Sequence, residues 1–209
     1  MKVNQTKCTL FKNFFFRFCV FAFAFFFTYN VFSQTTFSQI TQVENYIINN
    51  PTINAPTPPA RETLDVISIF SDSYNNITGA NYNPDWQQSG LGSANTAFQP
   101  TGSGNAVLAY KNFNYQGIEF NSEQDLTAME FLHFDIWTDG GVTPRIFVIS
   151  SGTEIPHSIS NGDGMWQSIE IPIAGITGDI TKAIQLKFDG GNGNSSAIYV
   201  DNIYFYKSP

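Results

Sequence analysis

The sequence has 209 residues, with 17 acidic and 10 basic side chains and a formal net charge of −7. Four basic residues lie within the first 17 positions, so a chain cleaved after them keeps six basic and 17 acidic residues, a net charge of about −11. Such a surface repels nucleic acid and anionic membranes, which excludes binding through phosphate neutralisation. It fits an exported protein whose ligand is neutral, or whose carboxylates hold cations.

Residues 1–33 have the pattern of a secretory signal peptide. Basic residues precede a run rich in Phe, Val and Ala over residues 18–27, and cleavage is expected after Ser33. The run is shorter than a typical membrane span, so we predict no membrane insertion after signal removal; an uncleaved anchor is the alternative. Both cysteines, Cys8 and Cys19, lie in this segment. The mature protein is therefore predicted to be secreted or held at the cell surface, without disulfides.

Residues 34–60 are predicted to form a polar linker. Thr, Asn and Gln are frequent there, and three prolines within residues 56–59 favour an extended, semi-rigid spacer. The domain proper is predicted to span residues 61–209, which is long enough to bury one hydrophobic core.

From residue 61 onward, short β-like runs alternate with clusters of Gly, Asn, Asp, Pro and Ser, and no amphipathic helix is predicted. Strands are expected over residues 65–71, 104–110, 117–121, 129–138, 145–151, 166–172, 183–188 and 197–206. This number and spacing predict an all-β fold, a β-sandwich and most simply a jelly roll.

The clearest core signal lies in residues 128–138. Alternation sends Leu132, Phe134 and Ile136 to one face of a strand, which is purely apolar and predicts a core face. The opposite face mixes rings with hydrogen-bonding groups, namely Phe131, His133, Asp135 and Trp137. That face is either a second packing layer with a polar network or a surface that meets a ligand.

Four motifs occur in order along the domain: APTPPAR (55–61), DVISIFSDSY (65–74), AMEFLHFDIWT (128–138) and IYVDNIYFY (198–206). Together they resemble a module of secreted Bacteroidetes proteins that is often appended to glycoside hydrolases, laminarinase-like family 16 enzymes among them. That module is similar to carbohydrate-binding modules of galactose-binding-like jelly-roll fold. The resemblance implies a non-catalytic domain that binds a polysaccharide, such as a β-glucan or an algal polysaccharide, with glycoside hydrolases of the same pathway as partners.

Signatures of an enzyme are missing from the sequence. No Glu-x-Asp-x-Glu-like strand supplies the paired carboxylates of a retaining family 16 glycosidase, and no nucleophile elbow is followed by plausible partners. His133 and His157 are the only histidines and no cysteine follows the signal, so zinc would lack ligands. We therefore predict a protein that is not an enzyme. The alternatives are a structural or adhesive protein-interaction sandwich and, less favoured, a polysaccharide lyase.

Aromatic side chains in polar loops supply candidate sugar contacts, because rings stack on the apolar faces of sugars while polar groups bind their hydroxyls. Tyr82 and Trp86 lie in a turn-rich polar segment, where the alternative is that Trp86 folds back as a lid over the sandwich edge. Tyr115 lies in a similar aromatic and amide-rich segment, and a structural role is its alternative. Trp166 opens an apolar strand and is predicted to be core.

The mixed face of residues 131–137 supplies a second set of candidates. If its sheet is concave, His133, Asp135 and Trp137 would form a groove floor, with Arg145 or Phe147 beside them on the next strand. Alternatively, His133 and Asp135 hydrogen-bond each other beneath a loop. If these two side chains touch, glycan binding is expected to weaken on acidification as His133 gains a proton.

The resemblance also implies a structural Ca²⁺ where the end of the first strand meets the last strand. Asp72 follows the first strand, and Asp201 interrupts an otherwise apolar last strand, where a carboxylate is costly unless it is paired. Asp72 and Asp201 are therefore the predicted calcium ligands, and a hydrogen-bond clamp on the backbone is the alternative. Asp189, in a Gly- and Asn-rich segment, is either a solvated turn residue or a second cation ligand.

Overall fold

The computed structural model describes residues 50–88, 93–102, 104–139, 143–160, 162, 164–176, 178–190 and 196–208. These residues belong to one compact unit, Ile48–Pro209. The predicted signal peptide with its two cysteines, and most of the predicted linker, lie outside the described residues. Among the described residues, no helix is long and apolar enough to cross a membrane.

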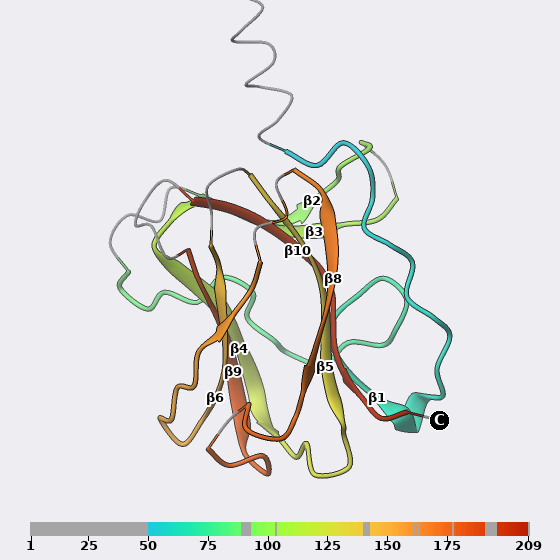
Figure 1. Ribbon diagram of the computed structural model, residues 1–209, viewed down its shortest axis with the longest axis vertical. Helices are drawn as coiled ribbons and strands as arrows, with labels where there is room; N and C mark the ends of the chain where they lie inside the picture. The colour runs from blue at the N-terminus through green and yellow to red at the C-terminus, as the bar shows by residue number, and fades with distance from the viewer. Residues whose placement is uncertain are drawn as a thin grey trace, which may run out of the picture. The chain divides into compact units, whose positions relative to one another are not determined.

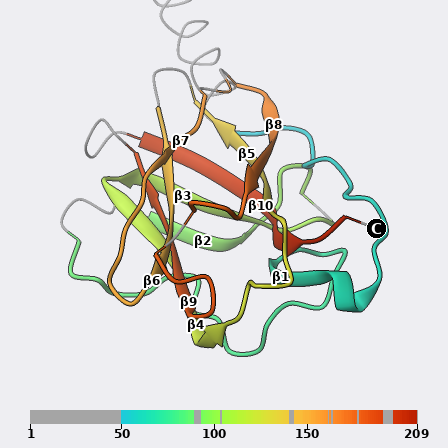
Figure 2. The ribbon, with the colours of Figure 1, turned by 60° about the horizontal axis from the view of Figure 1, so that its bottom comes forward.

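The described residues form a sandwich of two antiparallel sheets (Figures 1 and 2). In the larger sheet the order is β2 (Ser93–Phe98), β3 (Val107–Phe113), β10 (Ser196–Tyr206), β5 (Phe131–Thr138) and β8 (Trp166–Pro172), and β1 (Val66–Phe70) also pairs with β10. In the smaller sheet the order is β4 (Tyr115–Gln124), β9 (Ala183–Asp189), β6 (Arg145–Ser150) and β7 (His157–Ser158). The 3₁₀ turn η1 (Thr63–Asp65) precedes β1. The predicted all-β jelly-roll sandwich is confirmed.

Each of the eight predicted strands has a counterpart, and the bounds of β8 are those predicted. Two strands were not predicted. β2 is an edge strand of Ser, Ala, Asn and Thr before Phe98, and its middle residues, 95–97, are exposed, so it lacks the apolar alternation of a buried strand. β7 has only two residues, too few to show a period.

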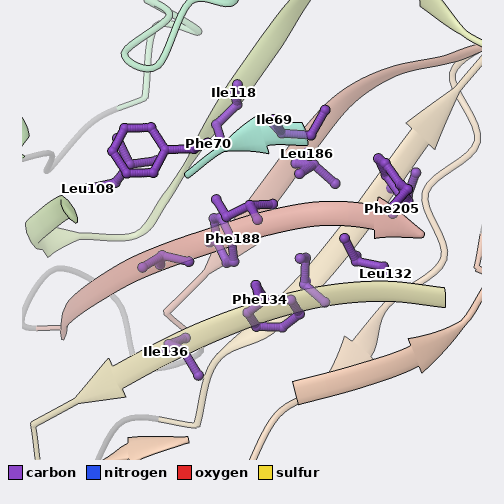
Figure 3. Packing of buried hydrophobic residues seen from close by; sticks show 14 of the residues in the cluster. Ile69, Phe70, Leu108, Ile118, Leu132, Phe134, Ile136, Leu186, Phe188 and Phe205 are labelled. Carbon is purple, nitrogen blue, oxygen red and sulfur yellow. The ribbon is translucent and has the colours of Figure 1, made fainter. Parts of the chain in front are cut away.

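The core lies between the two sheets (Figure 3). Leu132, Phe134 and Ile136 of β5 are fully buried in it, as their alternation predicts. Phe134 meets Phe188 of β9 edge to face, with ring centroids 6.0 Å apart. Since β5 and β9 belong to different sheets, this contact joins the two layers.

The central strand β10 contains a bulge. Asp201 pairs with Asp135 of β5, whereas the next pair is Tyr204 with His133, so β10 has one extra residue between them. Asn202, within the bulge, has a left-handed φ of 50°. The bulge leaves Val200 and Ile203 both fully buried in the core despite their odd spacing. Asp201 therefore interrupts the apolar strand at the one place where its alternation shifts.

Residues 50–61 contact the outer face of the larger sheet, the side away from the core (Figure 1, cyan). The side-chain amide of Asn202 donates to the carbonyl of Pro56 at 2.8 Å, and the indole N–H of Trp166 donates to the carbonyl of Ile53 at 2.9 Å. The Arg61 guanidinium lies 3.7 Å from the ring centroid of Tyr206. The described part of the predicted linker thus packs along the domain.

Candidate functional site

The solvent-facing side of β4, β9 and β6, called here the small-sheet face, is hollowed by a depression of about 380 Å³. Its lining combines aromatic, amide and charged side chains: Trp86, Tyr115, Ile149, Glu154, Gln185, Lys187 and Asp189.

The strand register arranges this face in three rows. Each row has one residue from β4, one from β9 and one from β6: Tyr115–Asp189–Arg145, Gly117–Lys187–Phe147 and Glu119–Gln185–Ile149. Because successive residues of a strand face opposite sides, the residues between them, Leu186 and Phe188 among others, enter the core. The polar residues of β9 therefore form the middle line of the face.

Trp86 lies on this face over β4. Its indole N–H donates to Oε1 of Glu119 at 2.5 Å. A Cβ atom added at Gly117 would lie 2.7 Å from the Trp86 ring, so the indole occupies the space that a side chain at this position would fill. Trp86 is half-buried. The indole is thus held against the sheet, with part of its surface open to solvent.

Tyr82 anchors the loop that carries Trp86. The Tyr82 hydroxyl donates to the carbonyl of Ile69 at 2.9 Å, and its own carbonyl accepts from the buried Tyr110 hydroxyl at 2.6 Å. Its ring packs edge to face on Phe70 of the core, with centroids 5.3 Å apart. Tyr82 therefore supports the loop from the core side.

Both cationic side chains of the small-sheet face are paired with carboxylates. Arg145 donates to Asp189 at 2.6 Å, and Lys187 forms an ion pair with Glu154. The Lys187 ammonium also lies 4.1 Å from the ring centroid of Phe147. The face therefore offers N–H donors and carboxylate acceptors beside aromatic rings, which suits a ligand rich in hydroxyl groups.

Three of the predicted sugar-binding residues, Trp86, Tyr115 and Arg145, meet on the small-sheet face. The sequence does not predict that Phe147 and the polar side chains of Glu119, Glu154, Gln185 and Lys187 belong to this face. The alternation of Gln185, Lys187 and Asp189 with buried Leu186 and Phe188 is a signal that could have found the middle line. Asp189, predicted as a turn residue or cation ligand, ends β9 and pairs with Arg145.

Of the other four predicted residues, Tyr82 supports the loop from the core side, and His133, Asp135 and Trp137 lie on the outer face of the larger sheet. The predicted position of Arg145 and Phe147 beside them is wrong, because β5 and β6 belong to different sheets. All three are buried, with exposed fractions of 7%, 1% and 3%. Their burial favours the interpretation of this face as a second packing layer.

A hydrogen-bond network joins these buried groups. His133 Nδ1 lies 2.8 Å from Glu170 Oε1, whereas its Nε2 is 3.7 Å from Asp135 Oδ1. Asp135 accepts from the Ser168 hydroxyl at 2.5 Å and from the Asn202 amide at 2.7 Å. The predicted hydrogen bond between His133 and Asp135 is therefore not formed, because the two atoms are 3.7 Å apart. Glu170 is the hydrogen-bond partner of the imidazole.

The network makes stability depend on pH. Burial disfavours the charged imidazole, but the hydrogen bond to Glu170 and the charges of Asp135 and Glu170 outweigh burial and raise the pKa of His133 above its ordinary value. A raised pKa stabilises the fold fully below about pH 6.5, and this contribution is lost as the pH rises through the folded-state pKa. We expect the urea midpoint of the wild type to exceed that of His133→Gln by an amount that shrinks between about pH 6 and pH 8. A pH-independent difference would contradict this.

His133 and the small-sheet face belong to different sheets. A glycan bound on the small-sheet face would therefore not contact His133, and protonation of His133 is not expected to weaken its binding there.

Unpaired oxygen atoms gather near the predicted calcium ligands. Asp201 is fully buried; its Oδ1 accepts from the backbone of Asn202 at 2.7 Å, but its Oδ2 has no partner. Asn105, whose side chain interacts with Asp201, has a buried Oδ1 without a partner. Burial and the charges of Asp72 and Asp135 raise the pKa of Asp201 to about 7. Two orphaned oxygens beside further carboxylates fit a hard cation.

The described residues contain no group of three or more His, Cys, Asp or Glu side chains that could hold a metal ion. A calcium site here would therefore need the Asn105 amide oxygen and backbone carbonyls in addition to Asp72 and Asp201, a mixture that Ca²⁺ accepts.

Sequence comparisons find no matching family model and no similar curated protein. Solved structures of family 29 carbohydrate-binding modules are similar in fold. One is a variant bound to mannohexaose, which is 16% identical to this chain and has a TM-score of 0.48. The match covers 67% of this chain and 89% of the module. A variant bound to cellulohexaose has the same identity and coverages and a TM-score of 0.47.

Proposed function

We propose that this protein is a secreted, non-catalytic module that binds a polysaccharide on its small-sheet face and acts beside glycoside hydrolases of the same pathway. The observation that carries the proposal is the position of Trp86, whose indole is held over Gly117 in the depression that Tyr115 also lines. Rings placed in this way can stack on sugar rings, while Gln185 offers hydrogen bonds to hydroxyl groups.

The charges of the face support a neutral glycan, such as a β-glucan or a neutral algal polysaccharide. Arg145 and Lys187 are already paired with Asp189 and Glu154, and Glu119 adds a further carboxylate. A uronate or sulfate group would have to displace a carboxylate from one of these pairs, at the cost of leaving that carboxylate without its partner.

Affinity electrophoresis against β-glucans, algal galactans, xylans and mannans tests the proposal. We expect retardation by at least one neutral glycan and no new reducing ends after incubation with it. Failure of every glycan to retard the protein would contradict the proposal and favour a structural or adhesive protein-interaction sandwich. Release of new reducing ends would instead favour a lyase.

We further propose that Ca²⁺ binds at Asp72, Asp201 and Asn105 and stabilises the fold. The buried, unpaired oxygens of Asp201 and Asn105 support this site. Asp72 lies nearby, and its Oδ2 accepts from the backbone of Ala106 at 3.0 Å.

Calcium at about 100 times its dissociation constant is expected to raise the melting temperature by roughly 5–10 °C relative to chelator. Differential scanning fluorimetry measures the shift. Asp201→Asn should abolish it, and Mg²⁺ should not reproduce it, because Mg²⁺ demands a stricter octahedral geometry. A melting temperature that neither chelator nor Ca²⁺ moves would rule out a stabilising calcium.

A further inference from the structure

We propose that Glu119 is a positioning residue for Trp86: its carboxylate holds the indole in the orientation that meets the ligand. The inference rests on the proposed glycan site and adds a residue to it that makes no assumed contact with sugar.

The indole N–H is the only hydrogen-bond donor of a tryptophan side chain, and in Trp86 it is used by Glu119 at 2.5 Å. An N–H bond to a carboxylate is charge-assisted and stronger than a bond between neutral groups. The side chain of Gln185 lies 3.4 Å from the same Glu119 oxygen and donates to it. The carboxylate is therefore itself held between two donors, from the loop and from β9.

Gly117 supplies the second half of this arrangement. A Cβ atom there would lie 2.7 Å from the indole and 2.0 Å from the carbonyl oxygen of Leu186, so position 117 leaves room only for hydrogen. The indole thus packs on the backbone of Gly117, and its N–H is held by Glu119. A ring fixed in advance loses less conformational entropy on binding than one that must be ordered by the ligand.

The loop around Trp86 is docked independently of the Glu119 side chain. Asn81 and Glu119 exchange two backbone hydrogen bonds, at 2.8 and 2.9 Å. The Gln116 side chain donates to Asn83 Oδ1 at 2.7 Å. Substitution of Glu119 therefore removes the tie to the indole while these bonds keep the loop on β4.

The position of Trp86 can be observed directly by ¹⁹F NMR of protein labelled with fluorotryptophan. The chain has three tryptophans, so three resonances are expected, and Trp86→Phe identifies the one from Trp86. We expect Glu119→Ala to shift or broaden this resonance and to leave those of Trp137 and Trp166 in place. Affinity for the glycan that retards the wild type should fall about tenfold. Glu119→Gln keeps an acceptor oxygen, so it should retain most of the glycan affinity and a Trp86 resonance close to that of the wild type.

Glu123→Ala is the matched control, because Glu123 is an exposed carboxylate on the same strand. It should change neither the Trp86 resonance nor the affinity. A Trp86 resonance that Glu119→Ala leaves unmoved would overturn the inference, as would a shifted resonance with unchanged affinity. The resonance is read without ligand, so a protein that binds no glycan defeats the proposed function while the effect of Glu119 on Trp86 is still measured. If Glu119→Ala does not fold, Glu119→Asp, whose carboxylate is one methylene shorter, gives the same test.

Discussion

Trp86→Ala is expected to lower the affinity for the bound glycan by about thirtyfold or more while leaving the domain folded. Truncation of a central aromatic contact typically costs about 2 kcal/mol or more of binding free energy. Trp86 is half-buried and lies outside the core cluster, so its loss removes a ligand platform and one hydrogen bond without opening a core cavity. Affinity electrophoresis over a range of glycan concentrations gives the ratio, and circular dichroism confirms the fold.

Phe98→Ala is the control for the loss of a ring. Phe98 is partly buried on the larger sheet, where its ring lies 5.0 Å from that of Tyr199, away from the small-sheet face. This variant should bind glycan as the wild type does. Undiminished affinity in Trp86→Ala would remove the small-sheet face as the glycan site.

Trp137→Ala is expected to destabilise the domain by about 3–5 kcal/mol, the usual cost of truncating a large buried aromatic side chain. Trp137 is 3% exposed, and its ring meets that of Tyr199 edge to face at 5.3 Å. Urea unfolding of the wild type and the variant measures the loss. The folded fraction should keep its glycan affinity, because Trp137 lies on the larger sheet, whereas Trp86 packs on β4 of the smaller sheet.

The contrary result would be equally informative. A Trp137→Ala variant of nearly normal stability that no longer binds glycan would place the site on the outer face of the larger sheet, with His133 and Asp135.

The strands and their core faces could be predicted because they depend on local alternation. Leu132, Phe134 and Ile136 form a core face by their spacing alone, and the structure confirms it. The sheet to which a strand belongs depends instead on long-range pairing, so β6 could not be separated from β5 by any local pattern. The pairing of Trp86 with Glu119, 33 residues apart, is hidden for the same reason.

The mixed face of β5 was ambiguous for a different reason. A buried polar network and a ligand site use the same residue types, so the presence of His133 and Asp135 in the sequence does not distinguish the two. What separates the two is burial, and residues 50–61, far away in the sequence, contact this side of the sheet. Asn105 was likewise missed as a calcium ligand candidate, because an uncharged side chain just before β3 has no pattern that marks it.

The bulge in β10 divides the central strand into two halves of opposite phase. Before it, even-numbered residues such as Val200 are core; after it, odd-numbered residues such as Ile203 and Phe205 are. Which side Tyr204 takes is therefore decided by a count of residues rather than by its own chemistry. At Asn202 a change of side chain leaves that count intact. Deletion of Asn202 would remove the extra residue, so that Ile203 follows Asp201 in unbroken alternation and Ile203 and Phe205 stay in the core with Tyr204 on the outer face. The deletion would instead cost the two hydrogen bonds that the Asn202 side chain donates to the Pro56 carbonyl and to Asp135.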